Sequence, residues 1–565
     1  MLKKWLEQQI SGKFPKVEFD ILIPPDGKLG DYSTNIAFVL AKKWDSRRLK
    51  KKDPSKIGDD LVREFSEDKE FKKIFKKIEF VKPGFINFYF SDGFLKNTLK
   101  EVLEKREKFG NSDIGKDIKI NLEFVSANPV GPLTVANIRA ASFGDTLANV
   151  LKKSGYEVTK EYYINDVGVQ VRTLGESVAK RYLQLKGKIV EFEDKLYQGD
   201  YIVDIAKEIK EENLFNSDDH FDEMVDVCKK YAVEKFIGSA KKSLEDLGVR
   251  FDVWFSEKQL HDSGEVKSLL EKLELKGHVY EKDGARWLKV GEILGKEIDD
   301  AVLVKSDSST SYLMNDIAYS NNKFKRGFDK AINIWGADHH GDVPRLLAGV
   351  KALGLKKKKL EVLLHQLVLI KNKDKLQRMS KRKGEFVLLD DLLKEVGKDA
   401  ARFFFMMKDL NTHMEFDVDL AKERSKNNPV YYIQYASARL NNIFEKLRIT
   451  TEIPGFAREP YPRNYELRIK GGHFKLLKEE EELKLLRDIA AFPDVIEDIA
   501  GTYNVHHLAG YALSLATDFH KFYEKHRVVN DDKELESARA ELCRGVYTVL
   551  KLCLDIMGIS APEKM

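Results

Sequence analysis

Two side chains, at positions 312 and 316, have the chemistry to bind a cation. Tyr312 and Asp316 are four residues apart, so a helix would place both on one face. A buried carboxylate beside a phenol suits a guanidinium or ammonium ligand. The alternative interpretation is a core tyrosine with an aspartate on the helix surface.

A second candidate site is a strand-to-helix turn in the stretch GPLTVANIRAASFGDTLANVL. Gly131 and Pro132 form the turn, and Thr134 and Asn137 could donate neutral hydrogen bonds to a phosphate or ribose. The first N–H groups of a helix and its dipole favour phosphate at this place. The stretch has no GxGxxG pattern, no P-loop and no histidine. The alternative is a turn that binds nothing.

A third candidate is the basic segment KLQRMSKRKGEFVLLDDLL, residues 375–393. Four basic residues crowd one loop before a helix that opens with Asp390 and Asp391, and these four are Arg378, Lys381, Arg382 and Lys383. The cluster ends in Gly384, which is typical of a loop that closes on a polyanion. The alternative is a basic loop exposed to solvent.

The elements that must position these residues begin with a small α+β unit over residues 1–112. Within it, IEFVKPGFINFYF predicts two strands joined at Pro83-Gly84. From Lys119, KINLEFVS predicts a strand, the following helix ends at Gly155, and EVTKEYYIND predicts a second strand. Strand, helix and strand in this order indicate a βαβ unit and a parallel sheet.

The rest of the chain divides into an insertion, returning strands and a helical end. Residues 172–275 are charge-rich and predict inserted helices without a strand, and strands return in AVLVKS, AINIWGAD and VLLHQLVLI. After about residue 390 the pattern is almost wholly helical. The predicted domains are therefore 1–112, 113–390 with the insertion, and 391–565.

Composition sets broad limits on the class of protein. The chain has 565 residues and a net charge of +5, which is too small to indicate a polyanion partner by itself. Its apolar runs fall short of the roughly 18 residues that cross a bilayer, and the opening residues lack an apolar signal sequence. Three scattered cysteines without a CxxC pattern favour a reducing cytoplasm over a disulfide scaffold or zinc ribbon.

These stretches together resemble one family. RMSKRKG is similar to the KMSKS loop of class I aminoacyl-tRNA synthetases, and LTVAN falls where that class carries its HIGH motif. The sequence resembles that of arginyl-tRNA synthetases in six further segments, which are EFVSANPVGPL, EYYINDVGVQ, NDIAY, WGADHHGDVPRL, NNPVYYIQYASARL and GISAPEKM. The resemblance runs in order along the whole chain. It implies a multidomain α/β protein with a Rossmann-like catalytic core, a helical insertion, a small N-terminal α+β domain and an all-α anticodon-binding bundle.

The resemblance also implies roles for individual residues. The arginine pocket would contain Glu123, Asn128, Tyr312 and Asp316. Catalysis would involve Lys381, Thr134, Asn137 and Arg378, with Lys381 stabilising the pentavalent phosphate. ATP would contact Pro132, Val135, Ala136, Gly336, Asp338, His339, Met379, Ser380 and Lys383. Contacts with tRNA would come from Phe85 and Asn87 at the elbow and from Tyr435 and Met565 at the anticodon.

The expected reaction is an ATP-dependent activation of arginine, followed by transfer to the terminal ribose of tRNA(Arg). ATP with Mg²⁺ is the implied cofactor, and no tightly bound metal is expected. Arginine, ATP and tRNA(Arg) are the expected partners, without DNA or membrane, and the expected form is a cytoplasmic monomer.

The sequence departs from the family's motifs at the nucleotide. Thr134, Ala136 and Asn137 stand where HIGH has histidine, glycine and histidine, and Arg378 replaces the first lysine of KMSKS. A neutral hydrogen bond contributes about 1 kcal/mol, against about 1.5–3 kcal/mol for one to a charged group. One alternative is therefore a weakly active or inactive tRNA-binding relative. A different class I synthetase is a more distant one, since the acidic pair Glu123 and Asp316 indicates a cationic substrate.

Overall fold

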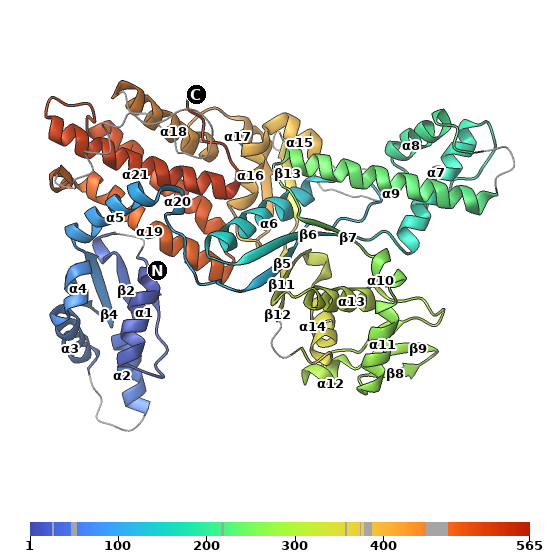
Figure 1. The fold of residues 1–565 in the computed structure, drawn as a ribbon, viewed down its shortest axis with the longest axis horizontal. Coiled ribbons are helices and arrows are strands. Elements are labelled where there is room, and N and C mark those ends of the chain that lie inside the picture. The colour runs from blue at the N-terminus through green and yellow to red at the C-terminus, as the bar shows by residue number, and fades with distance from the viewer. Residues whose placement is uncertain are drawn as a thin grey trace.

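The structure is a computed structural model that describes residues 1–24, 27–46, 53–215, 220–355, 359–372, 375–377, 387–447 and 473–565. The N-terminal unit lies at the lower left of Figure 1 and has a four-stranded antiparallel sheet in the order β1-β2-β4-β3. Its core is aromatic, because Phe75, Phe88 and Phe90 alternate inward from paired strands. The strand pair predicted around Pro83-Gly84 is confirmed as β3 and β4. The elements are α1 (Leu2–Lys13), β1 (Ile21–Leu22), β2 (Tyr32–Thr34), α2 (Ile36–Ser46), α3 (Pro54–Glu67), α4 (Lys69–Ile74), β3 (Phe75–Val81), β4 (Phe85–Phe90) and α5 (Asp92–Lys105).

A five-stranded parallel sheet forms the centre of the molecule, in the order β12-β11-β5-β6-β7. The predicted βαβ unit is confirmed: β5 leads into helix α6, which returns to β6, and Gly155 follows the helix with a positive φ of 89°. Because the strands are parallel, their carboxyl ends meet at one edge, where ligands bind in such sheets. The elements are β5 (Lys119–Glu123), α6 (Val135–Lys153), β6 (Glu157–Ile164), β7 (Val253–Ser256), β11 (Lys330–Gly336) and β12 (Lys359–His365).

The inserted segment is helical over most of its length but not throughout. Three helices form an arm at the upper right of Figure 1 with its own apolar core. The prediction of no strand between 172 and 275 is wrong at β7, whose four residues pair with β6 and extend the sheet. Such a short edge strand leaves little periodicity in a charged segment, so its pairing partner decides its structure. The helices are α7 (Val169–Leu185), α8 (Asp200–Glu211) and α9 (Phe221–Asp246), followed by α10 (Lys258–Asp262) and α11 (Glu265–Leu275).

A second small sheet lies below the central one in Figure 1. The predicted strand AVLVKS exists as β10, but it pairs with β9 in an antiparallel three-stranded sheet rather than joining the parallel sheet. Helix α13 crosses from this sheet towards the central one and carries Tyr312 and Asp316. The elements are β8 (Val279–Lys282), β9 (Ala285–Leu288), α12 (Val290–Leu294), β10 (Ala301–Val304), α13 (Tyr312–Lys325) and α14 (Asp342–Ala352).

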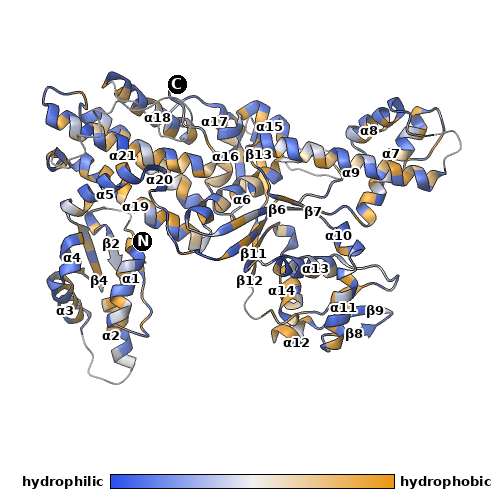
Figure 2. Cartoon of the chain, in the orientation of Figure 1, coloured by the Kyte–Doolittle hydropathy of each residue, from blue (hydrophilic) through white to orange (hydrophobic). Residues whose placement is uncertain are grey.

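The C-terminal part is a bundle of amphipathic helices, which carry hydrophobic and hydrophilic residues in alternation along their length in Figure 2. One strand interrupts the predicted helical pattern: β15 lies beyond residue 390 and pairs in parallel with β13 before that position. Because this pairing joins segments on both sides of residue 390, the domain limits stay predictions. The elements are β13 (Val368–Asn372), β14 (Lys375–Gln377), α15 (Leu389–Val396), α16 (Lys398–Met406), β15 (Met414–Asp417), α17 (Val418–Lys422), α18 (Pro429–Lys446), α19 (Glu480–Thr502), α20 (His506–Lys525) and α21 (Lys533–Met557). Among the described helices, none has the length and apolarity to cross a membrane.

Buried charges fix α6 between the sheet and the bundle. Asp145 in α6 accepts from Lys160 of β6 at 2.9 Å and from Arg402 of α16 at 2.7 Å. Arg402 is fully buried and also donates to the carbonyl of Met557 at the end of α21. Each charge thus has a partner, which is the condition for burying it. The helix that begins at the predicted nucleotide turn is therefore fixed to both neighbouring parts of the molecule.

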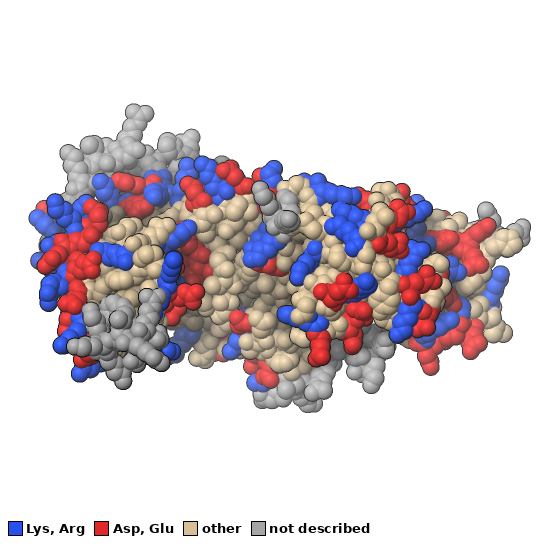
Figure 3. Space-filling view, turned by 90° about the horizontal axis from the view of Figure 1, so that it is seen from below, with Lys and Arg blue, Asp and Glu red and all other residues tan. Residues whose placement is uncertain are grey.

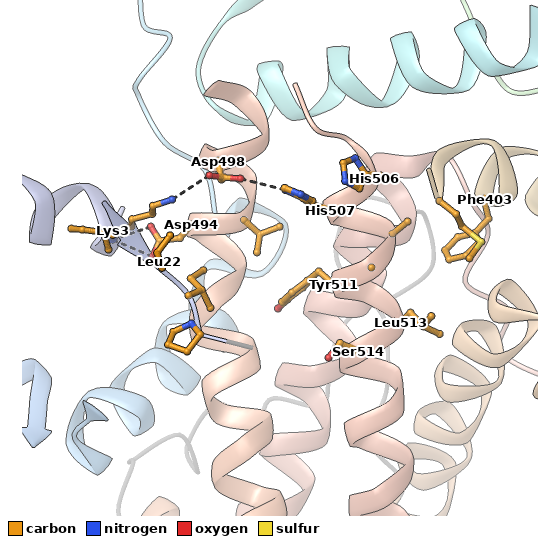
Figure 4. Close-up of a pocket in the computed structure, with 17 residues that line it drawn as sticks. Lys3, Leu22, Phe403, Asp494, Asp498, His506, His507, Tyr511, Leu513 and Ser514 are labelled. Carbon is orange, nitrogen blue, oxygen red and sulfur yellow. Dashed lines mark hydrogen bonds and ion pairs between the residues drawn. The ribbon is translucent and has the colours of Figure 1, made fainter. Parts of the chain in front are cut away.

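A cavity of about 810 Å³ lies where the N-terminal unit, α16, α19 and α20 meet (Figure 4). Its walls are mainly apolar, and Asp498 forms ion pairs with Lys3 and His507 at its rim. None of the residues that the sequence assigns to substrates lines it. The residues that the sequence assigns to arginine lie instead at the carboxyl edge of the central sheet.

Candidate functional site

A cavity of about 350 Å³ opens at the carboxyl ends of β5, β6, β11 and β12, with the first turns of α13 as one wall. It brings together all four residues predicted for arginine and two predicted for ATP, which are Glu123, Asn128, Tyr312, Asp316, Gly336 and His339. Its other lining residues are Val125, Ser126, Tyr163, Asn165, Gln170, Leu313, Ile334, Trp335, Asp342 and His365. Cavities of this size hold small molecules.

Glu123 is the last residue of β5, and both of its carboxylate oxygens have partners. Lys323 donates to Oε2 at 2.6 Å, and the hydroxyl of Ser126 donates to Oε1 at 3.0 Å. The lysine side chain is fully buried and the glutamate side chain only 5% exposed. The carboxylate is therefore held in one orientation at the cavity wall.

Asp316 contrasts with Glu123, because its carboxyl has no protein partner among the described residues. It lies one turn after Tyr312 in α13, as predicted, and both line the cavity. Among the described residues none donates a hydrogen bond to Asp316 or pairs with it as a cation. Burial raises the pKa of Asp316 well above its usual range, and the charges of Glu123, Glu257 and Asp342 raise it further. A cationic ligand would remove this penalty on the charged form.

The loop after β5 has an unusual backbone at the cavity. Val125 and Ser126 have φ of +70° and +39°, a left-handed conformation that costs β-branched and other non-glycine residues free energy. The hydroxyl of Ser126 also accepts the N–H of Tyr163 at 3.1 Å, and Asn128 donates to Gln170 of α7 at 2.8 Å. These contacts hold the loop against β6 and the inserted arm.

The predicted nucleotide turn lies outside this cavity and is largely satisfied by itself. Thr134 is the N-cap of α6, and its N–H and hydroxyl both donate to Oδ1 of Asn137, at 2.9 and 3.2 Å. This is the reciprocal capping of a helix start. The hydroxyl of Thr134 is therefore directed at Asn137 rather than at a ligand, and the amide Nδ2 of Asn137 is the donor that remains.

The remaining residues predicted for ATP differ in what they can offer. The Val135 side chain is fully buried and its N–H donates to the carbonyl of Val387. Pro132 and Ala136 are half-buried, and Asp338 is exposed and not part of the cavity lining. His339 lies 3.2 Å from Asp342 and beside the ring of Trp335. The predicted residues Arg378, Met379, Ser380, Lys381 and Lys383 lie outside the residues that the structure describes.

The residues predicted for tRNA lie on the N-terminal unit and the bundle. Phe85 is half-buried on β4, whereas Asn87 is buried and accepts from the hydroxyl of Ser33 at 2.7 Å. Tyr435 is 37% exposed on α18, with the guanidinium of Arg439 4.5 Å from its ring centre. Met565 is exposed. On the face seen in Figure 3, basic and acidic side chains are intermingled, so charge alone does not mark a tRNA surface.

Sequence reasoning missed several residues that line the cavity. Asn165, Trp335 and His365 lie at or beyond the ends of β6, β11 and β12. Burial, followed by the charge of Arg139, lowers the pKa of His365 to about 4, so its imidazole is neutral at neutral pH. The signal that could have found them is the rule that ligands bind at the carboxyl ends of parallel strands.

Comparison with known proteins gives matches over nearly the whole chain. Residues 98–444 match the catalytic domain of the class I (R) tRNA synthetases, residues 1–90 the arginyl tRNA synthetase N terminal domain, and residues 433–565 the DALR anticodon binding domain. The arginine–tRNA ligase of Thermotoga petrophila is 43% identical over 577 residues, with 100% of both chains covered.

The chain belongs to the arginyl-tRNA synthetase family. A further relative, the arginine–tRNA ligase of Aquifex aeolicus, is 40% identical and covers 97% of this chain and 96% of its own. The arginyl-tRNA synthetase structure from Thermus thermophilus has a TM-score of 0.74 at 20% identity, with 100% of both chains covered, and so has the same fold.

Membership of the family decides the main alternatives. The chain is an enzyme that ligates arginine to tRNA, and the expectation of a different class I synthetase is excluded. No observation favours the inactive tRNA-binding relative. As a class I synthetase it uses ATP.

Proposed function

We propose that the cavity at the carboxyl edge of the central sheet binds arginine, with the guanidinium at Asp316. The observation that supports this most strongly is that the carboxyl of Asp316, in an acidic cavity, has no protein partner among the described residues. Glu123 and the phenol of Tyr312 would complete the guanidinium site, and Asn128 would fix the loop that borders it. A planar guanidinium can satisfy several of these acceptors at once.

The nucleotide would lie between this cavity and the start of α6. Gly336 and His339 border the cavity on that side, and Asn137 would offer its Nδ2. Lys381 and Arg378 would supply the positive charge that the neutral Thr134 and Asn137 lack. The arginine carboxylate attacks the α-phosphorus of ATP and pyrophosphate leaves, so the protein acts by positioning and by neutralising charge. Magnesium would arrive as its complex with ATP.

Recognition of tRNA(Arg) would use both ends of the chain, with Phe85 and Asn87 at the elbow and Tyr435 and Met565 at the anticodon. The exposed ring of Tyr435 is suited to stack on an unpaired base. The domain limits 1–112, 113–390 and 391–565, a monomeric state and a cytoplasmic location are part of the same proposal.

The experiment is ATP–pyrophosphate exchange with purified enzyme, run with and without tRNA(Arg), and with arginine, lysine or citrulline. Of these three amino acids, only arginine should support exchange. Lysine carries a positive charge but lacks the planar guanidinium group. Citrulline has nearly the shape of arginine but no charge. Exchange with citrulline at the arginine rate would contradict the assignment of the cavity.

A further inference from the structure

Lys323 is a fully buried lysine directly behind the arginine cavity. It follows Asp316 by seven residues in α13, so both lie on one face of the helix. Its Nζ donates to Oε2 of Glu123 at 2.6 Å and to Oδ1 of Asn333 at 2.8 Å, and lies 4.2 Å from the ring centre of Tyr319. Lys323 does not line the cavity, so it is placed to act on the residues that do.

Among the neighbouring carboxylates, Lys323 forms its ion pair with Glu123. Glu161 on β6 is a second buried carboxylate beside α13, and it has its own cation, because Arg326 donates to both of its oxygens at 2.6 and 2.7 Å. The ionisable groups that influence or contact Glu123 are Lys323, Asp316 and Tyr319 from α13 and Tyr163 from β6. Lys323 is the cation of this set.

We propose that Lys323 is a positioning residue for arginine recognition, which holds the Glu123 carboxylate in one orientation at the cavity wall beside Asp316. The inference rests on the proposed function of the cavity. Two carboxylates that share a small cavity repel each other, and without a nearby cation one of them takes up a proton. The charge of Lys323 offsets this repulsion and its Nζ holds Oε2 of Glu123, so both carboxylates can face one guanidinium.

The ion pair of Lys323 with Glu123 also supports the strained loop at Val125 and Ser126. Lys323 binds Oε2 of Glu123, which leaves Oε1 to accept from Ser126, and Ser126 in turn accepts the N–H of Tyr163. The buried charge of Lys323 therefore helps to position the Ser126 loop, which borders the proposed arginine cavity.

The test is a set of variants assayed for arginine-dependent exchange between pH 6.5 and 9 with saturating ATP and tRNA. Lys323→Met removes the charge at similar length, and Lys323→Gln keeps an N–H donor without the charge, in case the first variant does not fold. Each should raise the KM for arginine by about tenfold at pH 7. The KM for arginine should stay above the parental value at each pH, whereas the KM for ATP should stay unchanged.

The double variant separates positioning from folding. Glu123→Gln should raise the KM for arginine, and Lys323→Met added to it should cost no more than about twofold, since Lys323 acts through Glu123. A parental KM at every pH in both Lys323 variants would overturn the proposal. So would a further tenfold loss in the Glu123→Gln background. An Asp316→Asn variant with parental arginine kinetics would instead reject the proposed function of the cavity.

Discussion

The arginine side and the nucleotide side of the site are built in different ways. On the arginine side, the ion pair with Lys323 and the hydrogen bond from Ser126 fix Glu123, whereas Asp316 has no partner among the described residues. On the nucleotide side, Thr134 and Asn137 satisfy each other at the start of α6. One side presents an unpaired carboxyl in a preformed cavity, and the other presents a capped helix with one free amide.

In the proposed assignment, this difference explains how the enzyme can depart from the HIGH motif. Specificity for arginine would then rest on charged groups whose loss is costly, and these groups match the family's pattern. Neutral hydrogen bonds to the nucleotide contribute about 1 kcal/mol each. Such contacts can change type if other charges neutralise the phosphates.

The largest effect should come from Asp316→Asn. The kcat/KM for arginine should fall by roughly 100-fold or more, because a buried charge pair that loses one partner costs about 2–5 kcal/mol. Steady-state aminoacylation at varied arginine measures it. Asp342→Asn is the matched control, since that carboxylate already has His339 and Arg345 as partners. An equal loss in the control would remove the special role of Asp316.

Lys381→Ala tests the nucleotide side at the position where charge develops. The rate of adenylate formation should fall by about 10²–10³, as for other lost transition-state donors. The affinity for arginine should stay unchanged, because Lys381 would not contact it. Single-turnover exchange gives the rate, and a parental rate would show that the basic segment is only a solvated surface.

The affinity for arginine should depend on pH through Asp316. Its pKa is raised by burial and then by Glu123, Glu257 and Asp342, so the free enzyme carries a neutral carboxyl below that pKa. Arginine requires the charged form, so its affinity should fall as the pH falls, by up to about tenfold per unit. Binding should release a proton, seen as a dependence of the calorimetric heat on the buffer. Asp316→Asn should abolish that dependence, and an unchanged buffer effect in this variant would assign the proton to another group.

The smallest effects should come from changes to Thr134 and Asn137, which cap the start of α6. Asn137→Leu removes the free amide and should raise the KM for ATP by about tenfold. Thr134→Val removes a hydroxyl that serves Asn137, so its effect on ATP should be smaller, about threefold. Both variants should lower the free energy of unfolding by about 1 kcal/mol, the usual cost of a lost N-cap. Equal effects on ATP would mean that Thr134 turns to the nucleotide after all.

Local patterns in the sequence could predict part of the site. The spacing of Tyr312 and Asp316 places both on one face of α13, and the strand–helix–strand pattern after Lys119 gives the parallel sheet. Contacts between distant positions left no such signal. Lys323 is 200 residues from Glu123, and β15 is too short to show as a strand before it pairs with β13.

The orientation of the Thr134 side chain is a feature that the sequence could predict only in part. The spacing of Thr134 and Asn137 fits reciprocal capping, but the residue types fit nucleotide binding equally well. Only the hydrogen bonds of the folded chain separate the two.

The most direct test of the account is a calorimetric comparison of arginine with citrulline, with tRNA(Arg) present, for the parent enzyme and Asp316→Asn. The two ligands have nearly the same shape and differ in charge. The account predicts that the parent binds arginine at least about 100-fold more tightly, and that Asp316→Asn reduces this preference to less than about tenfold. Equal binding of both ligands by the parent, or a full preference for arginine in the variant, would contradict it.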